Sequence, residues 1–462
     1  VKEKEEDRSA TTKKAIQRLL KSDPAPLMHK RNARLLTPGN IEDDLDQLGE
    51  CDWIIEAVIE NIDIKRSLYG KIDVVRRPGS IVSSNTSTIP LSQLTDGMSE
   101  GLEKDFLITH FFNPPRYMRL LELVAGTKTR SDARETIRNF ADRTLGKSVV
   151  DCNDTPGFIA NRIGIFWLQC AVVEAMDRGI SIEEADAVIG RPAGIPRTGV
   201  FGLLDMVGLD LMPKVLSSMA QSLPEDDPFH SVYRPPEMIE KMVEGGYTGR
   251  KGKGGFYRLS KEGGERFKEA IDLVTGDYAK ATKPSFDSVE VAKKGGLRAL
   301  LDHQDSGGQY GWAVWSKTLS YAASLVPKIA DDVAAVDEAM RLGYNWKFGP
   351  FELIDQLGVE WFVTKLRADG MKVPELLNTV SGKSFYRTEK GVLQFLSVEG
   401  AFIEVQRAPG VLLLSDIKRQ SKPIEKNMSA SLWNIGDGVL CLEFHSRMNS
   451  LDPFSLFMID IS

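Results

Sequence analysis

The sequence predicts an α/β domain that lacks its first strands, then two related helical domains, and last the beginning of a fourth domain. Three patterns support this prediction. Short β-rich runs alternate with amphipathic helical segments from about residue 50 to residue 151. The strand signals then give way to helical ones. A decapeptide that starts at Gly199 recurs in related form at Gly349, 150 positions later.

The bulk composition limits the classes of function. A chain of 462 residues has room for about three domains, and its 42% hydrophobic and 27% charged residues are ordinary for a soluble globular protein. The net charge of −6 offers no basic surface for nucleic acid, and the four cysteines form no CxxC pair that would hold zinc. No apolar run reaches the roughly 18 residues of a membrane span. We therefore expect a cytoplasmic protein without a metal, a nucleic-acid partner or a transmembrane segment.

The first domain should span residues 1–151 and form a parallel sheet with helical crossovers. A helix should follow the fourth strand, with Ser131 as its N-cap and Gly146 just past its end. Because Val1 opens into a helical segment with no strand before it, we expect the first strands to lie upstream in a longer parent protein. The predicted strands are residues 52–59, 80–86, 105–112, 120–125 and 148–151.

The first helical domain should span residues 152–258. Thr155 can cap its opening helix and Pro156 suits the first helical position, and the apolar run that follows should make this helix buried. Ser181 and Glu184 have the spacing of a capping box at the start of the next helix.

The repeat predicts that the second helical domain, residues 259–394, is a degenerate copy of the first. GVFGLLDMVG at residues 199–208 returns as GPFELIDQLG at residues 349–358, and a matching helix precedes each. The character changes again at about residue 395, where an apolar strand-like run ends in a turn. Residues 395–462 should therefore begin a fourth domain.

His110 is the strongest catalytic candidate among the five histidines. It ends a predicted strand, where open α/β sheets bind their ligands. Glu122 lies 12 residues later in the apolar run LLELVAG, where a carboxylate needs a partner such as an imidazole. Such a pair could act as a general base, with the carboxylate fixing the histidine tautomer. The alternative is that His110 caps a loop and Glu122 faces solvent at a sheet edge.

Other polar motifs have a structural reading beside the functional one. SSNTST at residues 83–88 follows a strand and can bind a ligand, yet its residues also form ordinary turns. Asn161 in the apolar helix can face a substrate, a cofactor or a core hydrogen bond. Carboxylates in EAVIEN, residues 56–61, end a strand that would border a nucleotide pocket. The glycine cluster at residues 249–255 lacks a preceding strand and GxGxxG spacing, so it is no phosphate loop.

Five motifs in order, EAVIEN, SNTST, THFFNPP, ELVAG and DTPGFIANR, resemble the L-3-hydroxyacyl-CoA dehydrogenase family. The resemblance implies a Rossmann-type NAD-binding domain followed by helical dehydrogenase domains, and oxidation of a 3-hydroxyacyl-CoA with NAD as cofactor. His110 would be the general base and Glu122 its support, while Ser87 and Asn161 would hold the substrate oxygens and the nicotinamide edge. The family positions that contact the cofactor fall on Ala57, Glu60, Lys65, Asn85, Ser87, Asn113 and Lys241.

The family's glycine fingerprint and its ribose-binding acidic residue are absent from this sequence, so we expect them upstream of Val1. The second helical copy has no counterpart of Asn161, and we expect it to complete the core that the first copy would otherwise bury in a dimer. LCLEFHSRMNSLD resembles the opening strand and turn of a crotonase-type enoyl-CoA hydratase. The resemblance thus implies fatty-acid β-oxidation by a bifunctional protein, a monomer or homodimer with a possible thiolase partner.

Three other readings remain open from the sequence. Another dehydrogenase with a Rossmann domain and a helical partner, of the 3-hydroxyacid or 6-phosphogluconate type, would use a lysine where this chain offers a His-Glu pair. A catalytically silent scaffold would keep the fold for protein contacts, although the intact candidate residues argue against it. In a third reading, the hydratase is the main activity and the dehydrogenase is auxiliary.

Overall fold

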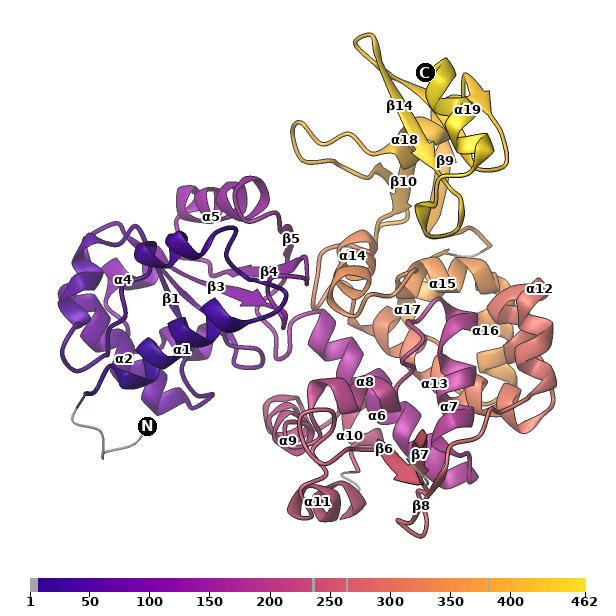
Figure 1. Cartoon of the computed structure of the whole chain (residues 1–462), viewed down its shortest axis with the longest axis horizontal. Helices are drawn as coiled ribbons and strands as arrows, with labels where there is room; N and C mark the ends of the chain where they lie inside the picture. The colour runs from indigo at the N-terminus through magenta and orange to yellow at the C-terminus, as the bar shows by residue number, and fades with distance from the viewer. Residues whose placement is uncertain (1–6, 235–236, 263–264, 381) are drawn as a thin grey trace. The chain divides into compact units, whose positions relative to one another are not determined.

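The computed structural model describes residues 7–234, 237–262, 265–380 and 382–462. The chain divides into two units, which are described separately below. The first comprises residues 1–331 and 335–353, and the second comprises residues 332–334 and 354–462. Figure 1 follows the chain from the α/β domain in indigo, through the helical domains in magenta and orange, to the last residues in yellow.

A five-stranded sheet in the order β1-β2-β3-β4-β5 forms the first domain. β1, β2 and β3 are parallel, but β4 runs antiparallel to β3, and β5 is parallel to β4. The expectation of a wholly parallel sheet is therefore wrong at β4. Residues 112–119, which join β3 to β4, are too few for the crossover helix that a parallel neighbour needs. The strands are β1 (Trp53–Glu56), β2 (Ile81–Ser84), β3 (Phe106–Phe111), β4 (Leu120–Ala125) and β5 (Ser148–Asp151).

Helices cover this sheet and bury its apolar side chains. Ala133 and Ile137 of α5 pack with Leu107 and Leu123 from the sheet. Arg130, not Ser131, is the N-cap of α5, because Arg130 keeps an extended backbone while its guanidinium pairs with Asp105. The helices of the domain are α1 (Ala10–Lys21), α2 (Ile62–Val75), α3 (Leu91–Thr95), α4 (Glu100–Asp105) and α5 (Ser131–Arg143), with 3-10 turns η1 (Lys30–Leu35) and η2 (Leu45–Glu50).

The first helical domain is built on α6 (Ala160–Arg178), which is buried over most of its length as expected. α6 starts at Ala160 rather than at Pro156, so the expected cap by Thr155 is wrong. The capping box of Ser181 and Glu184 is confirmed at the start of α7. The other elements of this domain are α7 (Ile182–Ile189), η3 (Arg191–Ala193), α8 (Phe201–Val207), α9 (Met212–Ser222), α10 (Phe229–Val232), α11 (Glu237–Glu244), β6 (Tyr257–Glu262), β7 (Glu265–Ile271) and β8 (Tyr278–Lys280).

The internal repeat extends to its hydrogen bonds. Asp205 accepts the backbone N–H groups of Phe256 and Tyr257, at 2.7 and 2.8 Å. Asp355, 150 positions later, accepts those of Phe385 and Tyr386 at the same two distances. Each aspartate thereby ties its helix to the first strand of a three-stranded antiparallel sheet, β6-β7-β8 in the first copy and β9-β10-β11 in the second. The two copies therefore share a fold as well as a motif.

The expected domain boundaries at residues 258 and 394 fall inside strands β6 and β10, whose sheets continue past them. Sequence patterns alone missed these sheets because their strands are short and largely exposed. The second copy contains α12 (Asp287–Leu301), α13 (Ser306–Leu325), α14 (Val333–Gly343), α15 (Pro350–Leu357), α16 (Val359–Ala368), α17 (Glu375–Val380), β9 (Tyr386–Glu389), β10 (Val392–Leu396) and β11 (Phe402–Glu404).

The last part of the second unit holds an antiparallel sheet in the order β12-β13-β14. Ala430 and Leu432 of β13 form a small core with Met458 of α19. The elements are α18 (Leu414–Gln420), β12 (Glu425–Lys426), β13 (Ala430–Gly436), β14 (Val439–Phe444), η4 (Arg447–Asn449) and α19 (Pro453–Ile461).

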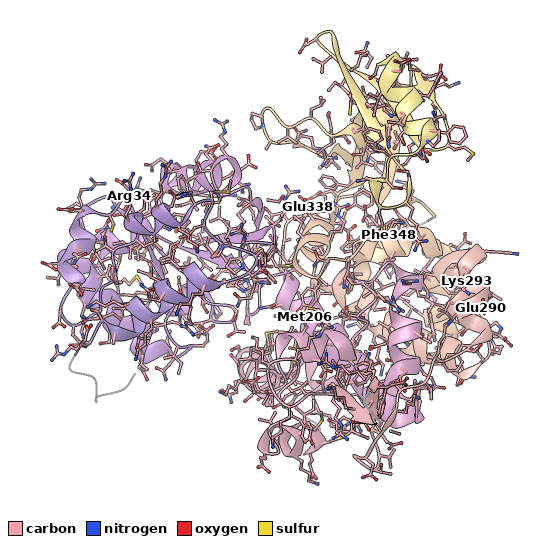
Figure 2. All side chains as sticks on the ribbon, in the orientation of Figure 1. Arg34, Met206, Glu290, Lys293, Glu338 and Phe348 are labelled. Carbon is pink, nitrogen blue, oxygen red and sulfur yellow. The ribbon has the colours of Figure 1, made fainter. Side chains whose placement is uncertain are left out.

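Charged side chains lie on the outside of the helices. Lys293 and Glu290 form such a surface pair on α12, with 2.5 Å between ammonium and carboxylate (Figure 2). Among the described residues, no helix combines the length and the apolar character that a membrane crossing requires.

Candidate active site

The site lies where the parallel strands β1, β2 and β3 end. Glu56 is the last residue of β1, Ser84 is the last of β2, and His110 is the last but one of β3. Because parallel strands present their carboxyl ends at one edge of a sheet, these side chains gather there. Each of the three polar motifs therefore lies at the carboxyl end of its strand.

His110 and Glu122 form a buried pair across neighbouring strands. They lie directly opposite each other in the antiparallel register of β3 and β4, and Nδ1 of His110 is 2.7 Å from Oε2 of Glu122. Both residues are buried, with Glu122 completely enclosed. Phe112 and Phe158 flank the imidazole, with ring centroids 4.5 and 5.8 Å away. A hydrogen bond between buried groups fixes the orientation of the ring. Nδ1 donates this hydrogen bond, which leaves Nε2 as the acceptor nitrogen.

The second oxygen of Glu122 caps helix α6. Oε1 accepts the backbone N–H groups of Ile159 and Ala160, at 3.1 and 2.8 Å. Phe158 adopts a left-handed backbone with φ of 48°, which turns these two N–H groups toward the strand. The positive end of the helix dipole faces the carboxylate, so the same helix that Glu122 caps attracts it electrostatically. This long-range cap explains why α6 begins at Ala160.

Asn161 follows immediately in the first turn of α6 and is partly exposed. Its backbone follows by one residue the Ala160 amide that donates to Glu122. Within the described part of the chain, the side-chain amide of Asn161, the hydroxyl of Ser87 and Nε2 of His110 have no recorded hydrogen-bond partner. These groups are therefore available to a ligand that offers oxygens and an amide.

Lys65 is buried in a charged network beneath the strand edge. Its ammonium lies 2.8 Å from Oε1 of Glu56 and 3.3 Å from Oε2 of Glu60. Glu56 also accepts the hydroxyls of Tyr69 and Ser84, at 2.6 and 2.7 Å. Burial raises the pKa of Glu56, but the hydrogen bonds from Lys65, Tyr69 and Ser84 outweigh it and leave the pKa below its usual value. Only 1% of Lys65 is exposed, and its contact with a cofactor stays a prediction.

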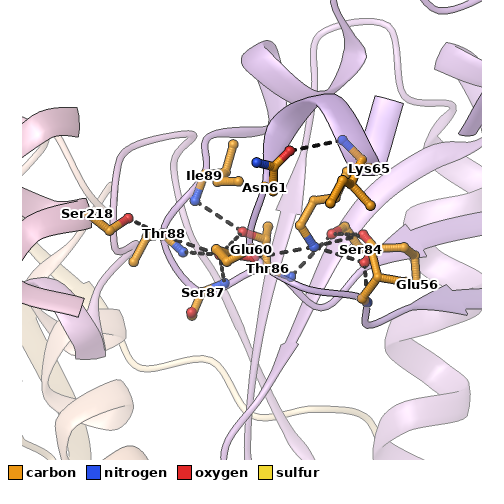
Figure 3. A network of polar contacts seen from close by, with 12 residues as sticks. Glu56, Glu60, Asn61, Lys65, Ser84, Thr86, Ser87, Thr88, Ile89 and Ser218 are labelled. Atoms are coloured by element: carbon orange, nitrogen blue, oxygen red, sulfur yellow. Dashed lines mark hydrogen bonds and ion pairs between the residues drawn. The ribbon is translucent and has the colours of Figure 1, made fainter. Parts of the chain in front are cut away.

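Glu60 holds the loop that carries Ser87 (Figure 3). Its Oε1 accepts the hydroxyl of Thr86 at 2.5 Å and the backbone N–H groups of Ser87 and Thr88, at 3.0 and 3.3 Å. The hydroxyl of Thr88 in turn lies 2.9 Å from that of Ser218 on α9. The loop is therefore ordered from two sides, and Ser87 at its tip stays exposed to ligand.

The remaining predicted residues at this edge differ in their exposure. Asn85 is tied to the protein, because its Oδ1 accepts the backbone N–H of Phe111 at 2.9 Å. Ala57, just past β1, and Asn113, just past β3, are exposed. They are placed to meet a ligand that lies along the ends of the strands.

Lys241 is not part of this edge. It lies on α11 with its side chain exposed, 3.7 Å from Glu237. It lines a cavity of about 840 Å³ whose walls come from residues 176–278, among them Met176, Met242 and Tyr247. No other residue of the predicted site lines that cavity, and a contact of Lys241 with the cofactor stays a prediction.

Several partners of the site were not foreseen from the sequence. Tyr69 lies one helical turn after Lys65 on α2, a spacing that could have been read as a shared face. Asp154 accepts the backbone N–H groups of Leu91 and Ser92, at 2.5 and 2.8 Å, and so ties the hinge between β5 and α6 to the end of the Ser87 loop. No local pattern signals a contact that spans more than 60 residues. Among the described residues, no cluster of His, Cys, Asp and Glu could hold a metal ion.

Two family models match the chain. The NAD-binding domain of 3-hydroxyacyl-CoA dehydrogenase matches residues 1–155. The C-terminal domain of the same enzyme matches residues 157–259 and again residues 312–387, in agreement with the internal repeat.

Known relatives cover most of the chain. A Bacillus subtilis protein named as a 3-hydroxyacyl-CoA dehydrogenase is 38% identical over 456 residues, which are 97% of this chain and 57% of that protein. A Rickettsia felis protein named as a fatty acid oxidation complex trifunctional enzyme is 37% identical over 98% of this chain and 60% of its own length. A Deinococcus radiodurans protein named as a 3-hydroxyacyl-CoA dehydrogenase is 38% identical over 55% of this chain and 73% of its own length. The chain thus spans somewhat more than half the length of the first two relatives.

The crystal structure of 3-hydroxybutyryl-CoA dehydrogenase from Escherichia coli K12 has the same fold, with a TM-score of 0.61. The likeness covers 80% of this chain and 91% of that one, at 22% sequence identity.

Proposed function

The chain belongs to the 3-hydroxyacyl-CoA dehydrogenase family, its first domain being the NAD-binding domain of that family, and we propose that it oxidises an L-3-hydroxyacyl-CoA to the 3-ketoacyl-CoA. The observation that carries the proposal is the buried bond of 2.7 Å between His110 and Glu122 at the carboxyl end of the sheet. A neutral histidine with its acceptor nitrogen free can take a proton from an alcohol. Glu122 is held in place by the two amides at the start of α6, and its carboxylate can stabilise the imidazolium that results.

The proposed roles follow from this geometry. Nε2 of His110 removes the proton of the 3-hydroxyl group, and Glu122 keeps the imidazole in the required tautomer. NAD, when bound, accepts the hydride from C3 of the substrate. Ser87 precedes the dyad in the sequence and Asn161 follows it. The hydroxyl of Ser87 and the amide of Asn161 hold the substrate oxygens and the nicotinamide edge. His110 then returns its proton to solvent after the product leaves.

The cofactor-binding residues are proposed at the ends of the strands. Ala57, Asn85 and Asn113 line this edge, and Glu60 supports the loop that carries Ser87. The partly exposed carboxylate of Glu60 can accept hydrogen bonds from ribose hydroxyls. Lys65 acts through Glu60 and Glu56, whose carboxylates it holds in place.

The whole protein is proposed to act in fatty-acid oxidation and to carry an enoyl-CoA hydratase domain that begins within residues 395–462. The hairpin of β13 and β14, followed by a turn and α19, supports the resemblance of LCLEFHSRMNSLD to a crotonase-type opening. The name of the Rickettsia felis relative points the same way. The oligomeric state and an association with a thiolase remain predictions of the resemblance.

NADH formation from matched L- and D-3-hydroxyacyl-CoA substrates tests this proposal. The whole protein should reduce NAD with the L-substrate and not with the D-enantiomer, because a fixed base and a fixed nicotinamide accept only one configuration at C3. A folded protein that binds NAD but oxidises neither substrate would overturn the proposal. Hydration of an enoyl-CoA without any NAD reduction would favour the hydratase as the main activity.

A further inference from the structure

We propose that the second helical copy is a working part of the active site, because Gly343 at the end of its helix α14 and Tyr344 just after it position both members of the His110–Glu122 dyad. This inference rests on the proposed function and assigns a role to a copy that lacks catalytic residues of its own. The two residues are positioning residues, since they touch the neighbours of the dyad rather than the substrate.

Gly343 packs against the residues next to each member of the dyad. A Cβ at this position would lie 2.8 Å from Cδ2 of Leu120, 3.1 Å from Cβ of Ala160 and 3.3 Å from Cε1 of Phe112. The first distance is shorter than any normal carbon contact, and the other two are tight. Only glycine therefore allows α14 to approach the strand and α6 this closely.

Two of these neighbours lead directly to the dyad. The ring of Phe112 packs against the imidazole of His110 in a tilted arrangement, with 4.5 Å between centroids. The backbone N–H of Ala160 donates to Oε1 of Glu122 at 2.8 Å. A displacement at Gly343 would therefore reach the imidazole through one contact and the carboxylate through the other. Close-packed interiors transmit such displacements, because they contain few voids to absorb them.

Tyr344 contacts the same face of α6 one turn further along the helix. Its ring lies so close to Gly164 that a Cβ there would come within 2.1 Å of Cζ and 2.4 Å of the hydroxyl. The ring also meets Trp167 edge-on, with centroids 6.2 Å apart and an angle of 88°. Burial, and then the nearby charge of Glu122, raise the pKa of the Tyr344 phenol above its usual value. The helix that Glu122 caps is thus held between the strand and α14.

Other residues of the second copy contact the same short segment, residues 153–164. On α13, the hydroxyl of Tyr321 accepts a hydrogen bond from Nε of Arg162 at 2.5 Å and donates one to Asp227 at 2.8 Å. Asn153, in the hinge before α6, donates its backbone N–H to the carbonyl of Ile329 at 2.9 Å. These contacts fall between residues 153 and 164, the segment that carries the cap and Asn161. The second copy therefore holds the part of the first copy on which the dyad depends.

Gly343→Ala is the direct test, and Gly70→Ala on α2 is its matched control, because a Cβ at Gly70 meets nothing within 4 Å. Two signals of this chain, measured without cofactor or substrate, report on the dyad. One is the proton resonance of the hydrogen bond between His110 and Glu122. The other is hydrogen exchange of the Ile159 and Ala160 amides, with amides in the middle of α6 as reference. We expect Gly343→Ala to shift the resonance and to speed exchange at these two amides by about tenfold, while Gly70→Ala changes neither.

Variants at Tyr344 keep the test decisive if Gly343→Ala fails to fold. Tyr344→Phe keeps the ring and should leave both signals as in the wild type, whereas Tyr344→Ala should change both. Gly164→Ala should also change them, and Tyr344→Leu in the same chain should restore them by making room for the new methyl group. Unchanged signals in folded Gly343→Ala and Tyr344→Ala proteins would overturn the proposal.

Turnover separates this inference from the proposed function. In the whole protein, Gly343→Ala should lower kcat for 3-hydroxyacyl-CoA oxidation by up to about 10²-fold with little change in KM, as for a misplaced base. Changed signals in a protein that never reduces NAD would leave the positioning role intact and refute the proposed function. Normal turnover of Gly343→Ala, with wild-type signals, would refute the positioning role alone.

Discussion

Glu122 binds Nδ1 of His110 through one carboxylate oxygen and the first turn of α6 through the other. The same side chain therefore sets the tautomer of the proposed base and joins the sheet to the helical domain. Asn161 lies in that helical turn. The position of the Glu122 carboxylate therefore affects the imidazole of His110, the first turn of α6 and Asn161.

His110→Ala should lower kcat by about 10² to 10⁴ while leaving NAD affinity nearly unchanged, because it removes the base without touching the cofactor contacts. Steady-state rates and NAD titration of the whole protein measure the two effects separately. His445→Ala, in the second unit, is the control and should leave both values as they are. If His110→Ala instead unfolds the protein, the histidine is structural.

Glu60→Gln should weaken NAD binding by about 10-fold to 100-fold, the range expected when a charged acceptor of several hydrogen bonds loses its charge. Its Oε1 holds Thr86 and the backbone of the Ser87 loop, so the loop should loosen as well. Calorimetric titration with NAD measures the affinity. Glu100→Gln, on an exposed ion pair of the same domain, should bind NAD like the wild type. Equal affinity in the Glu60 variant would show that this carboxylate does not contact the cofactor.

The buried pair of Glu56 and Lys65 should make the first domain sensitive to acid. The folded pKa of Glu56 lies below its usual value of 4.5, so folding favours the charged form. This stabilisation is fully present above the unfolded pKa and is lost as the pH falls below about 4.5 through the folded pKa. Glu56→Gln should therefore reduce the dependence of the unfolding free energy on pH in this acid range, as followed by thermal unfolding.

Two comparisons check this acid dependence. Glu100→Gln should leave it unchanged, because the Glu100–Lys104 pair is screened by solvent. Lys65→Met should destabilise the protein by about 3–5 kcal/mol near neutral pH, because it leaves the buried carboxylate of Glu56 without its cationic partner. An acid dependence that Glu56→Gln does not alter would show that other carboxylates govern it.

The repeated aspartates should be needed for stability and not for chemistry. Asp205 accepts two buried backbone N–H groups, and burial raises the pKa of its carboxyl to about 6. Asp205→Ala should cost about 1–3 kcal/mol for each donor left without a partner. Denaturant unfolding measures this loss, and kcat of the folded fraction should stay within about twofold of the wild type. A selective loss of kcat would place Asp205 in the reaction.

Local patterns could predict the elements that depend on local chemistry. The strands of the first domain, the buried helix α6 and the capping box at Ser181 all follow from residue spacing. The pairing of His110 with Glu122 was also within reach, since a buried carboxylate in a strand demands a partner. The strand that carries Glu122 was nevertheless given the wrong direction, because direction depends on the length of the preceding connection.

The remaining features depend on contacts between distant residues. The start of α6 is set by Glu122, 38 positions before Ala160, so Thr155 and Pro156 misled the helix boundary. Lys65 has the residue type and position of a cofactor ligand, but Glu56 draws it beneath the surface. Lys241 is placed by the packing of α11 in the helical domain, which no short motif encodes. The approach of Gly343 and Tyr344 joins two copies of the repeat and has no local signal.

The most direct test of the proposed His110–Glu122 dyad is NADH formation by Glu122→Gln in the whole protein, compared with the wild type at saturating NAD and L-3-hydroxyacyl-CoA. A glutamine of the same size would present an N–H or a neutral oxygen to Nδ1, so it could neither fix the tautomer with a charge nor stabilise the imidazolium. We expect the kcat of Glu122→Gln to fall by about 10² to 10⁴ while the variant still folds and binds NAD. A folded Glu122→Gln protein with wild-type kcat would contradict the proposed dyad.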